Sequence, residues 1–378
     1  MSIDFMAAMR RATTATRGGS AAEATRIIQD ALAGRPGGDD ASAEPRPRKP
    51  LREVVKTLRW GRSAVGRPKI DLAEPPPLPD GARFLTHSFA CAAGTRGYNL
   101  YVPASAVHGL NGLVLMLHGC NQTPEDFATG TNMNAVAEAN RLLVAYPAQT
   151  RADNAAACWN WFNPADQRRN AGEPAILAGL ARTLAAEFDI PPARTFAAGL
   201  SAGGAMVAVL GATYPDLFAA IGVHSGLPAG AANDVVSAFA AMRGDSGIAS
   251  VRMHTEGGSP VPRTIIFHGT ADRTVHAGNA ERVAAAATAR APSGASRSER
   301  GIARSGRAYA RTLHEDPQGT VAVELWMIEG AGHAWAGGNE GGSYTDPSGP
   351  DASAEMARFF LSPQSSERRR GDPGVLPR

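Results

Sequence analysis

The sequence has little of what membrane, nucleic-acid-binding and metal-binding proteins show. No apolar run approaches the roughly 20 residues of a membrane-spanning helix, and the first residues lack the basic start and apolar stretch of a signal peptide. The net charge of the 378 residues is only +3, which gives no argument for nucleic acid. No C-x-x-C pair occurs among the three cysteines. We therefore expect no membrane span, no nucleic-acid partner, no metal or organic cofactor, and a cytoplasmic location.

The order of the patterns predicts one large domain with appendages. Residues 1–33 are Ala-rich and read as helical, and the Pro- and Gly-rich residues 34–50 read as a linker. Residues 51–59 have helical apolar spacing beside basic residues, which we interpret as a helix on the main domain rather than on a membrane or an acidic partner. We place a helical and linker extension at 1–80, the main domain at 81–362 and a disordered tail at 363–378.

Strand and helix patterns alternate along the main domain. Apolar or alternating runs predict strands at 83–90, 96–102, 112–117, 142–146, just before Gly199, and at 219–223, 264–267 and 321–328. Helical patterns fall between them at 135–141, 173–188, after Ser201, and at 279–289 and 352–361. Such alternation predicts an α/β protein with a mostly parallel central sheet flanked by helices. The polar, Arg-rich residues 291–311 read as a surface insertion.

A Gly-x-Ser-x-Gly stretch lies at the junction of a predicted strand and a helix. Gly199-Leu200-Ser201-Ala202-Gly203 follows a small apolar run and precedes a helix of small residues. In that context the pentapeptide is typical of a nucleophile elbow, where glycines two residues before and after the serine avoid collisions at the sharp turn. The alternative is that Ser201 merely caps the helix. We predict Ser201 as a nucleophile.

A serine nucleophile needs a base, and the base needs a carboxylate to orient it. In the α/β-hydrolase order the acid and then the histidine follow the serine, each on a loop after a strand. Asp272 follows the strand at 264–267, and His333 lies between glycines after the strand at 321–328. The alternatives are that Asp272 caps a turn and that His333 is a structural histidine.

Other residues compete for these two roles. His268 and His276 lie too close to the acid to keep the usual order, and His224 is better placed to shape the site. Glu329 is a rival acid, but it lies between the last strand and the histidine, which is the wrong place to reach Nδ1. We retain Asp272 and His333.

An oxyanion hole needs two backbone N–H groups directed at the developing negative charge. The Ala202 amide, at the start of the helix after Ser201, is one candidate. The early strand at 112–117 ends in His118-Gly119-Cys120-Asn121, whose turn exposes backbone. We predict the Cys120 amide as the second donor, with the Asn121 amide as the runner-up.

Aromatic side chains are few, at 6% of the chain, yet Trp159, Trp161 and Phe162 lie almost side by side. These rings could form an apolar wall of a substrate cleft, or they could be ordinary core. We predict substrate contacts from four residues: Trp159, Trp161, Trp335 and Asn121.

Five motifs in order make the chain resemble the poly(3-hydroxybutyrate) depolymerase family of esterases, which is related to feruloyl and acetylxylan esterases. They are Leu117 to Thr123, Cys158 to Phe162, Gly199 to Gly204, Asp272 to Val275, and Gly332 to Trp335. The resemblance spans about residues 82–362. It implies an α/β-hydrolase fold, a triad of Ser201, Asp272 and His333, and an oxyanion hole near Cys120.

The resemblance also implies features that the pattern of residues does not. It suggests a disulfide between Cys120 and Cys158, and an extracellular location as the alternative to the cytoplasmic one. We see no appended polymer-binding domain and therefore expect soluble oligomers or small esters rather than polymer granules as substrates.

The sequence thus predicts a serine carboxylester hydrolase that cleaves hydroxyalkanoate polyesters or their oligomers through an acyl-enzyme. An esterase acting on feruloyl or acetyl groups of plant polysaccharides is the alternative within enzymes. The alternative outside enzymes is a catalytically silent α/β-hydrolase that only binds. The sequence does not indicate an oligomeric state.

Overall fold

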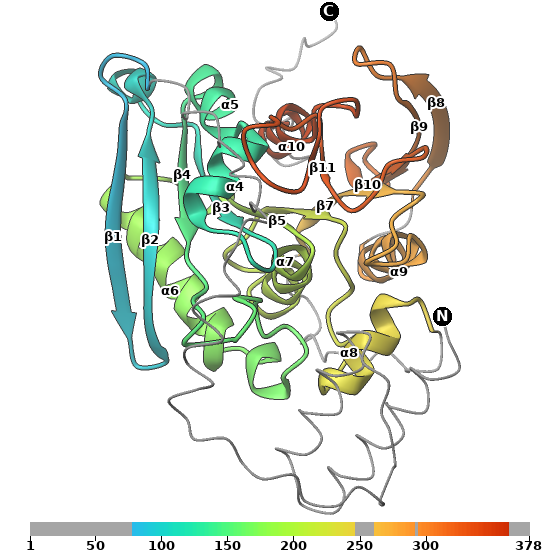
Figure 1. Ribbon diagram of the computed structural model, residues 1–378. Helices are drawn as coiled ribbons and strands as arrows, with labels where there is room; N and C mark the ends of the chain where they lie inside the picture. The colour runs from blue at the N-terminus through green and yellow to red at the C-terminus, as the bar shows by residue number, and fades with distance from the viewer. Residues whose placement is uncertain (1–77, 246–260, 292–293, 363–378) are drawn as a thin grey trace, which may run out of the picture. The chain divides into compact units, whose positions relative to one another are not determined.

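The core of the protein is a ten-stranded sheet in the order β1-β2-β4-β3-β5-β6-β7-β10-β9-β8 (Figure 1). The computed structural model describes residues 78–245, 261–291 and 294–362. The strands are β1 Arg83–Cys91, β2 Gly94–Val102, β3 Gly112–Leu117, β4 Leu142–Pro147, β5 Thr195–Leu200, β6 Ala220–His224, β7 Arg263–Gly269, β8 Ser296–Ile302, β9 Ala308–Glu315 and β10 Val321–Ile328. A second, two-stranded sheet pairs β11 Trp335–Ala336 with β12 Thr345–Asp346.

The middle of the large sheet is parallel and its edges are antiparallel. Strands β4, β3, β5, β6, β7 and β10 run parallel, whereas β1–β2 and β8–β9 are hairpins at opposite edges. Strands β3 to β7 are buried along their whole length, which explains their continuous apolar sequences. The carboxyl ends of parallel strands meet at one edge of the sheet, and ligands of such sheets bind there.

Helices cover both faces of the sheet, and each face has its own apolar core (Figure 1). One core contains side chains of α6 Gly172–Glu187, α7 Ala202–Thr213, α8 Val235–Met242 and α9 Gly278–Thr288. The other contains side chains of α4 Pro124–Thr131, α5 Met133–Asn140 and α10 Ala352–Leu361. Short 3-10 turns, η1 Ala104–His108, η2 Pro164–Gln167 and η3 Pro192–Arg194, complete the described elements.

The predicted strands and helices of the main domain are confirmed to within a few residues, and so is the α/β fold with its mostly parallel sheet. Helix α4 was not predicted, although Thr123 is a clear N-cap whose hydroxyl accepts from the Asp126 amide at 3.2 Å, with Pro124 as the first helical residue. Helix α8 was not predicted either; Asp234 and Ser237 form a capping box at its start.

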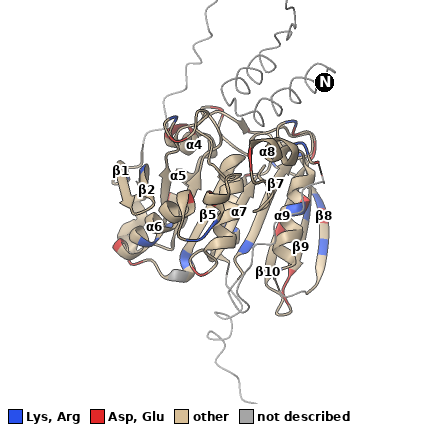
Figure 2. Ribbon diagram, turned by 90° about the horizontal axis from the view of Figure 1, so that it is seen from below, with Lys and Arg blue, Asp and Glu red and all other residues tan. Residues whose placement is uncertain are grey.

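The predicted surface insertion at 291–311 lies on the surface, but it forms strands rather than a solvated loop. Strands β8 and β9 form a hairpin there that extends the sheet beyond β10. Arg297 and Arg300 lie on β8 and Arg311 on β9, and Figure 2 shows this basic colouring along the hairpin. Almost every residue of β8 is exposed, so it lacks the apolar alternation by which a strand is recognised. Charged side chains on such an edge also hinder pairing with other chains.

The predicted helices at 1–33 and 51–59, the linker between them and the tail from 363 lie outside the described residues. The domain boundary at 80/81 therefore stays a prediction, as does the location of the protein. Among the described ranges, no helix is both long and apolar enough to span a membrane.

Candidate active site

Ser201 lies at a sharp turn between β5 and α7. Its φ of 58° and ψ of −118° are unusual for a residue with a side chain. A Cβ on Gly199 would lie 2.6 Å from the carbonyl carbon of Gly203, and a Cβ on Gly203 would overlap the Leu117 carbonyl. Glycine is therefore required at both positions for the turn to form against the end of β3.

The Ser201 hydroxyl is not a helix cap. Ser201 occupies the N-cap position of α7, but its side chain makes no capping hydrogen bond. Its backbone amide donates to the His224 carbonyl at 2.8 Å, which fixes the turn to the end of β6. Ala202 is the first residue of α7, where a backbone N–H has no acceptor within the helix. The turn thus presents a hydroxyl next to a helix N-terminus.

Asp272 is on the loop after β7, and its two oxygens have different partners. Oδ1 accepts from the amides of Thr274 at 2.8 Å and Val275 at 2.9 Å. Oδ2 accepts from His333 Nδ1 at 2.7 Å and lies 3.3 Å from His268 Nε2. Burial alone would raise the pKa of the Asp272 carboxyl, but the hydrogen bonds from His268 and His333 outweigh it and lower that pKa well below its usual value.

The hydrogen bond to Asp272 fixes the tautomer of His333. Because Nδ1–H donates to the carboxylate, Nε2 carries a lone pair that can accept a proton. The imidazole is 11% exposed. Within the described residues Ser201 Oγ has no hydrogen-bond partner, so the structure brings His333 to Asp272 but does not join it to Ser201. Such bonds are often long before a substrate binds.

The competing residues do not take the place of His333, although His268 also lies 3.3 Å from Asp272 Oδ2. The buried His268 ring lies against the Val275 carbonyl, with Nε2 2.9 Å from that oxygen, and His276 is exposed and accepts from the Gly278 amide at 3.1 Å. Glu329 is exposed on the loop before His333. The third competing histidine, His224, accepts hydrogen bonds from the backbone at Ser201 and at Ala336.

His224 links the elbow to the histidine loop, the name we use for residues 329–335. The ring is fully buried, stacked between Phe267 and Trp335 with centroids 5.7 and 5.0 Å away. Its Nε2 accepts from the Ala336 amide at 3.0 Å while its backbone oxygen accepts from the Ser201 amide. Burial lowers the pKa of His224 well below its usual value, so the ring stays neutral. One residue therefore contacts both Ser201 and the segment that follows His333.

We call residues 118–122 the oxyanion loop. A Cβ on Gly119 would lie 3.6 Å from Ser201 Cβ, so this loop runs directly beside the elbow. The Gly119 amide donates to Gln122 Oε1 at 2.9 Å. The Asn121 amide donates to the Ala156 carbonyl at 2.9 Å, which removes it as a candidate for the oxyanion hole. The Cys120 amide remains.

The oxyanion loop is bound to the segment that contains the tryptophans. Cys120 and Cys158 form a disulfide with a Cα–Cα distance of 4.3 Å. Trp159 Nε1 donates to the His118 carbonyl at 3.0 Å, and His118 Nε2 accepts from the Gln149 amide at 3.0 Å. Burial lowers the pKa of His118, so this imidazole too is held neutral.

Two of the predicted substrate contacts are wrong. Trp159 and Trp335 have 0% and 1% of their surface exposed, and both indole N–H groups donate to the protein, that of Trp335 to Ser353 Oγ at 3.1 Å. These rings are core residues that support the two loops. Trp161 is 5% exposed and Asn121 is exposed, and their contact with substrate stays a prediction.

Two residues near the site were not singled out by the sequence patterns. Gln122 is buried and bridges the oxyanion loop to residue Ser343, donating to its carbonyl at 3.1 Å. Tyr344 is exposed, and its ring lies edge to face with that of His333 at 6.5 Å between centroids. For Tyr344, the only signal in the sequence is that an aromatic residue stands within a glycine-rich stretch.

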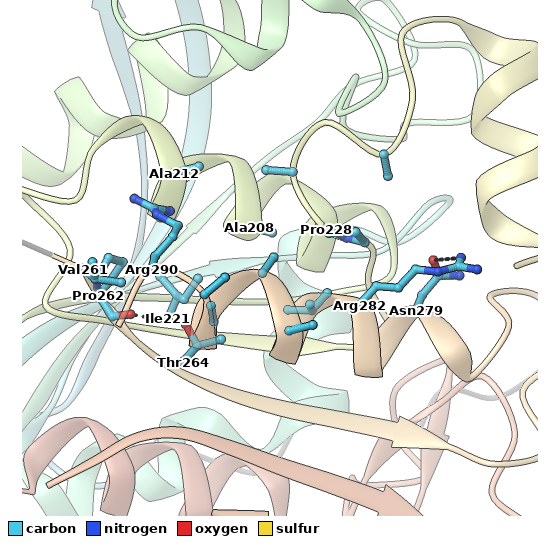
Figure 3. A pocket seen from close by; sticks show the side chains of 18 of the residues that line it. Ala208, Ala212, Ile221, Pro228, Val261, Pro262, Thr264, Asn279, Arg282 and Arg290 are labelled. Atoms are coloured by element: carbon cyan, nitrogen blue, oxygen red, sulfur yellow. Dashed lines mark hydrogen bonds between the residues drawn. The ribbon is translucent and has the colours of Figure 1, made fainter. Parts of the chain in front are cut away.

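A separate cavity of about 760 Å³ lies between α7 and α9 (Figure 3). Ala208, Ile221, Pro262 and Arg290 are among its lining residues, and Ser201, Asp272 and His333 are not. It therefore differs from the candidate site. Within the described part of the chain, no cluster of three or more His, Cys, Asp or Glu side chains could hold a metal ion.

Comparison with known proteins identifies the family. The chain is 31% identical over 234 residues to "Poly(3-hydroxyalkanoate) depolymerase C" from Paucimonas lemoignei, covering 58% of this chain and 54% of that protein. It is 37% identical over 145 residues to "Poly(3-hydroxybutyrate) depolymerase" from Ralstonia pickettii, covering 35% and 29%. "Acetylxylan esterase A" from Talaromyces purpureogenus is 30% identical over 205 residues, covering 50% and 51%. The chain thus spans about half or less of these relatives' length.

Comparison of structures supports the same fold. An acetyl xylan esterase from Aspergillus awamori superposes with a TM-score of 0.58 and 21% sequence identity, covering 74% of this chain and 98% of that one.

Residues 96–294, more than half of the chain, match the family described as "Esterase PHB depolymerase". The chain has the α/β-hydrolase fold and belongs to the PHB depolymerase family of esterases.

Proposed function

We propose that the protein is a serine carboxylester hydrolase in which Ser201, His333 and Asp272 act as nucleophile, base and orienting acid. The observation that carries the proposal is the 2.7 Å hydrogen bond from His333 Nδ1 to Asp272 Oδ2. It leaves Nε2 as the ring nitrogen not bonded to the carboxylate, and His224 ties the following backbone to the elbow of Ser201. A serine, an oriented imidazole and a buried carboxylate in this order suit acyl transfer.

The proposed reaction has two halves. As Nε2 of His333 comes within hydrogen-bond reach of Ser201, it removes the hydroxyl proton and Oγ attacks the ester carbonyl carbon. The amides of Cys120 and Ala202 stabilise the negative oxygen of the tetrahedral intermediate. The intermediate collapses, and His333 returns the proton to the leaving alcohol. Water then attacks the acyl-enzyme by the same route, releasing the acid and restoring the serine.

The names of the relatives favour hydroxyalkanoate esters as substrates. Two of the relatives described above are named for depolymerising poly(3-hydroxyalkanoate) or poly(3-hydroxybutyrate). We propose polyesters of this type, or their soluble oligomers, as the substrate class. Acetyl esters of polysaccharide are the second candidate, since one relative and one structural neighbour carry acetylxylan esterase names. Rates on hydroxybutyrate dimers, methyl ferulate and p-nitrophenyl acetate would rank the candidates.

The test of the reaction is Ser201→Ala. We expect hydrolysis of p-nitrophenyl butyrate to fall by about six orders of magnitude because the nucleophile is lost. Circular dichroism should show an unchanged fold. Ser298→Ala, an exposed serine on β8, is the matched control and should keep full activity. A fluorophosphonate probe should label Ser201 in the unmodified protein; failure to label it, with activity absent, would favour a protein that only binds.

A further inference from the structure

Tyr344 is held beside His333 by a backbone conformation that tyrosine rarely adopts. Its φ is 54°, in the left-handed region where a side chain collides with its own backbone. Such a conformation persists only where the surroundings enforce it, and it is found often at binding sites. The side chain is nevertheless 47% exposed, although burying a tyrosine ring normally stabilises a fold. Core packing therefore does not explain the position of this ring.

The backbone around Tyr344 is fixed on both sides. On the N-terminal side, the Ser343 amide donates to Asp126 Oδ1 at 2.8 Å, and its carbonyl accepts from Gln122. The Tyr344 carbonyl itself accepts from the Trp335 amide at 2.7 Å. On the C-terminal side, Thr345 pairs with Trp335 in the small sheet. The exposed ring therefore projects from a rigid backbone that is bound to α4 and to the histidine loop.

The hydrogen bond from Trp335 to Tyr344 joins this segment to the histidine loop, and the bond from Gln122 to Ser343 joins it to the oxyanion loop. Trp335 is two residues from His333, and the two rings of His333 and Tyr344 lie at 81° with centroids 6.5 Å apart. Gln122 accepts from the Gly119 amide in the oxyanion loop and donates to Ser343. The exposed ring thus lies beside the imidazole of His333, on a segment that is bonded to both loops.

We propose that Tyr344 is a specificity-determining residue that contacts the alcohol portion of the ester. This inference rests on the proposed function. In that reaction His333 protonates the leaving oxygen, so the alcohol group departs on the side of the imidazole, where Tyr344 is exposed. A flat ring on a rigid backbone can contact an extended alcohol with little loss of conformational freedom. The substrate class is an ester whose alcohol is larger than methanol, such as the next hydroxyacyl unit of an oligomer.

The experiment compares two esters that share the butyryl group: methyl butyrate and methyl 3-(butanoyloxy)butanoate. For the second ester, the release of methyl 3-hydroxybutanoate is measured, because release of methanol would report cleavage of its other ester bond. Attack at the butyryl carbonyl gives the same acyl-enzyme from both compounds, so differences report on the alcohol. We expect Tyr344→Ala to lower kcat/KM for the larger ester about fivefold to tenfold, the size of one aromatic contact. The value for methyl butyrate should change less than about twofold. Tyr344→Phe keeps the ring and should retain the preference.

Ile302→Ala is the matched control, since Ile302 is a large, exposed side chain on β8 at the far edge of the sheet. Ile302→Ala should leave kcat/KM unchanged for both esters. An equal loss on both esters in Tyr344→Ala would overturn the inference, because it would mean that the ring only positions His333. Unchanged rates on both would overturn it as well. Activity that persists in Ser201→Ala would instead refute the proposed function.

Discussion

The oxyanion loop and the histidine loop approach Ser201 from opposite sides and are held by different means. The oxyanion loop is covalently joined to the segment at 158 through Cys120 and is further held by Gln122. The histidine loop has no covalent link; it is held by hydrogen bonds that His333 donates to Asp272 and that the adjacent Ala336 amide donates to His224. The proposed oxyanion donor is a backbone amide that must stay in place throughout the reaction. The proposed base must accept and return a proton, and hydrogen bonds leave its ring some freedom to move.

Breaking the hydrogen bond between the histidine loop and Asp272 should have the larger effect on activity. In Asp272→Asn the side-chain amide can present an N–H to His333 Nδ1, which favours the wrong tautomer of the imidazole. We expect kcat/KM on p-nitrophenyl butyrate to fall by about 10³ to 10⁴-fold. The protein should remain folded, because the Thr274 and Val275 amides can still donate to the remaining oxygen.

Glu329→Gln is the control for this prediction. Glu329 is a carboxylate on the same side of the sheet, but it is exposed, and the bond to His333 comes from Asp272. Its replacement should change kcat/KM less than about twofold. A larger loss in Glu329→Gln than in Asp272→Asn would mean that the acid has been assigned to the wrong residue.

Breaking the covalent link of the oxyanion loop should have a smaller effect on activity and a clear effect on stability. In the double variant Cys120→Ser, Cys158→Ser, the loop keeps two hydrogen bonds: Gly119 donates to Gln122, and Trp159 donates to the His118 carbonyl. We expect kcat/KM to fall about tenfold at most, less than the loss of a whole oxyanion donor. The free energy of unfolding in urea should fall by about 2–4 kcal/mol, because a loop of 38 residues is no longer closed.

Cys91→Ser is the matched control, since Cys91 is an exposed free cysteine on β1. It should leave both the activity and the stability unchanged. If the double variant lost activity as completely as Asp272→Asn, the disulfide and not the hydrogen bonds of Gln122 and Trp159 would determine the position of the oxyanion loop.

Local patterns along the chain explain which parts of the site could be predicted from the sequence. Ser201, Asp272 and His333 follow buried parallel strands whose apolar runs are strong local signals, so their places along the chain could be predicted. The elbow needs glycine at 199 and 203, which is also visible in the sequence. The central strands and the helices α5, α6, α7, α9 and α10 were predicted for the same reason, whereas α4 and α8 were not.

Contacts between distant segments could not be predicted in this way. The ring of His224 bonds to the amide of Ala336, and Gln122 bonds to Ser343, more than 100 residues away in each case. The burial of Trp159 and Trp335, which were predicted as substrate contacts, could not be foreseen because it depends on what packs over each ring, which no local pattern records. Strand β8 was missed because it is exposed on almost every residue. Each of these features is set by tertiary packing rather than by local periodicity.

The smallest effect that we predict concerns the pH dependence of the free energy of unfolding. Each of the two loops contacts one buried neutral imidazole. His118 is in the oxyanion loop and His224 lies under the histidine loop, and burial lowers both pKa values, that of His224 further. In the unfolded chain both histidines regain a pKa of about 6.5. Below that pH the unfolded chain binds protons that the folded protein does not, so stability is fully present above pH 6.5 and is lost as the pH falls.

We expect the free energy of unfolding to decrease on going from pH 7.5 to 5.5, by at most about 1.4 kcal/mol per pH unit for each histidine below pH 6.5. Asp272 does not contribute in this range, because its lowered pKa keeps it ionised in the folded protein and its usual value is already below pH 5. His224→Gln and His118→Gln should each make the free energy less dependent on pH than in the unmodified protein, measured by urea unfolding at pH 7.5, 6.5 and 5.5. If the slope is the same in both variants and in the unmodified protein, protons are bound elsewhere and neither imidazole is held neutral by its loop.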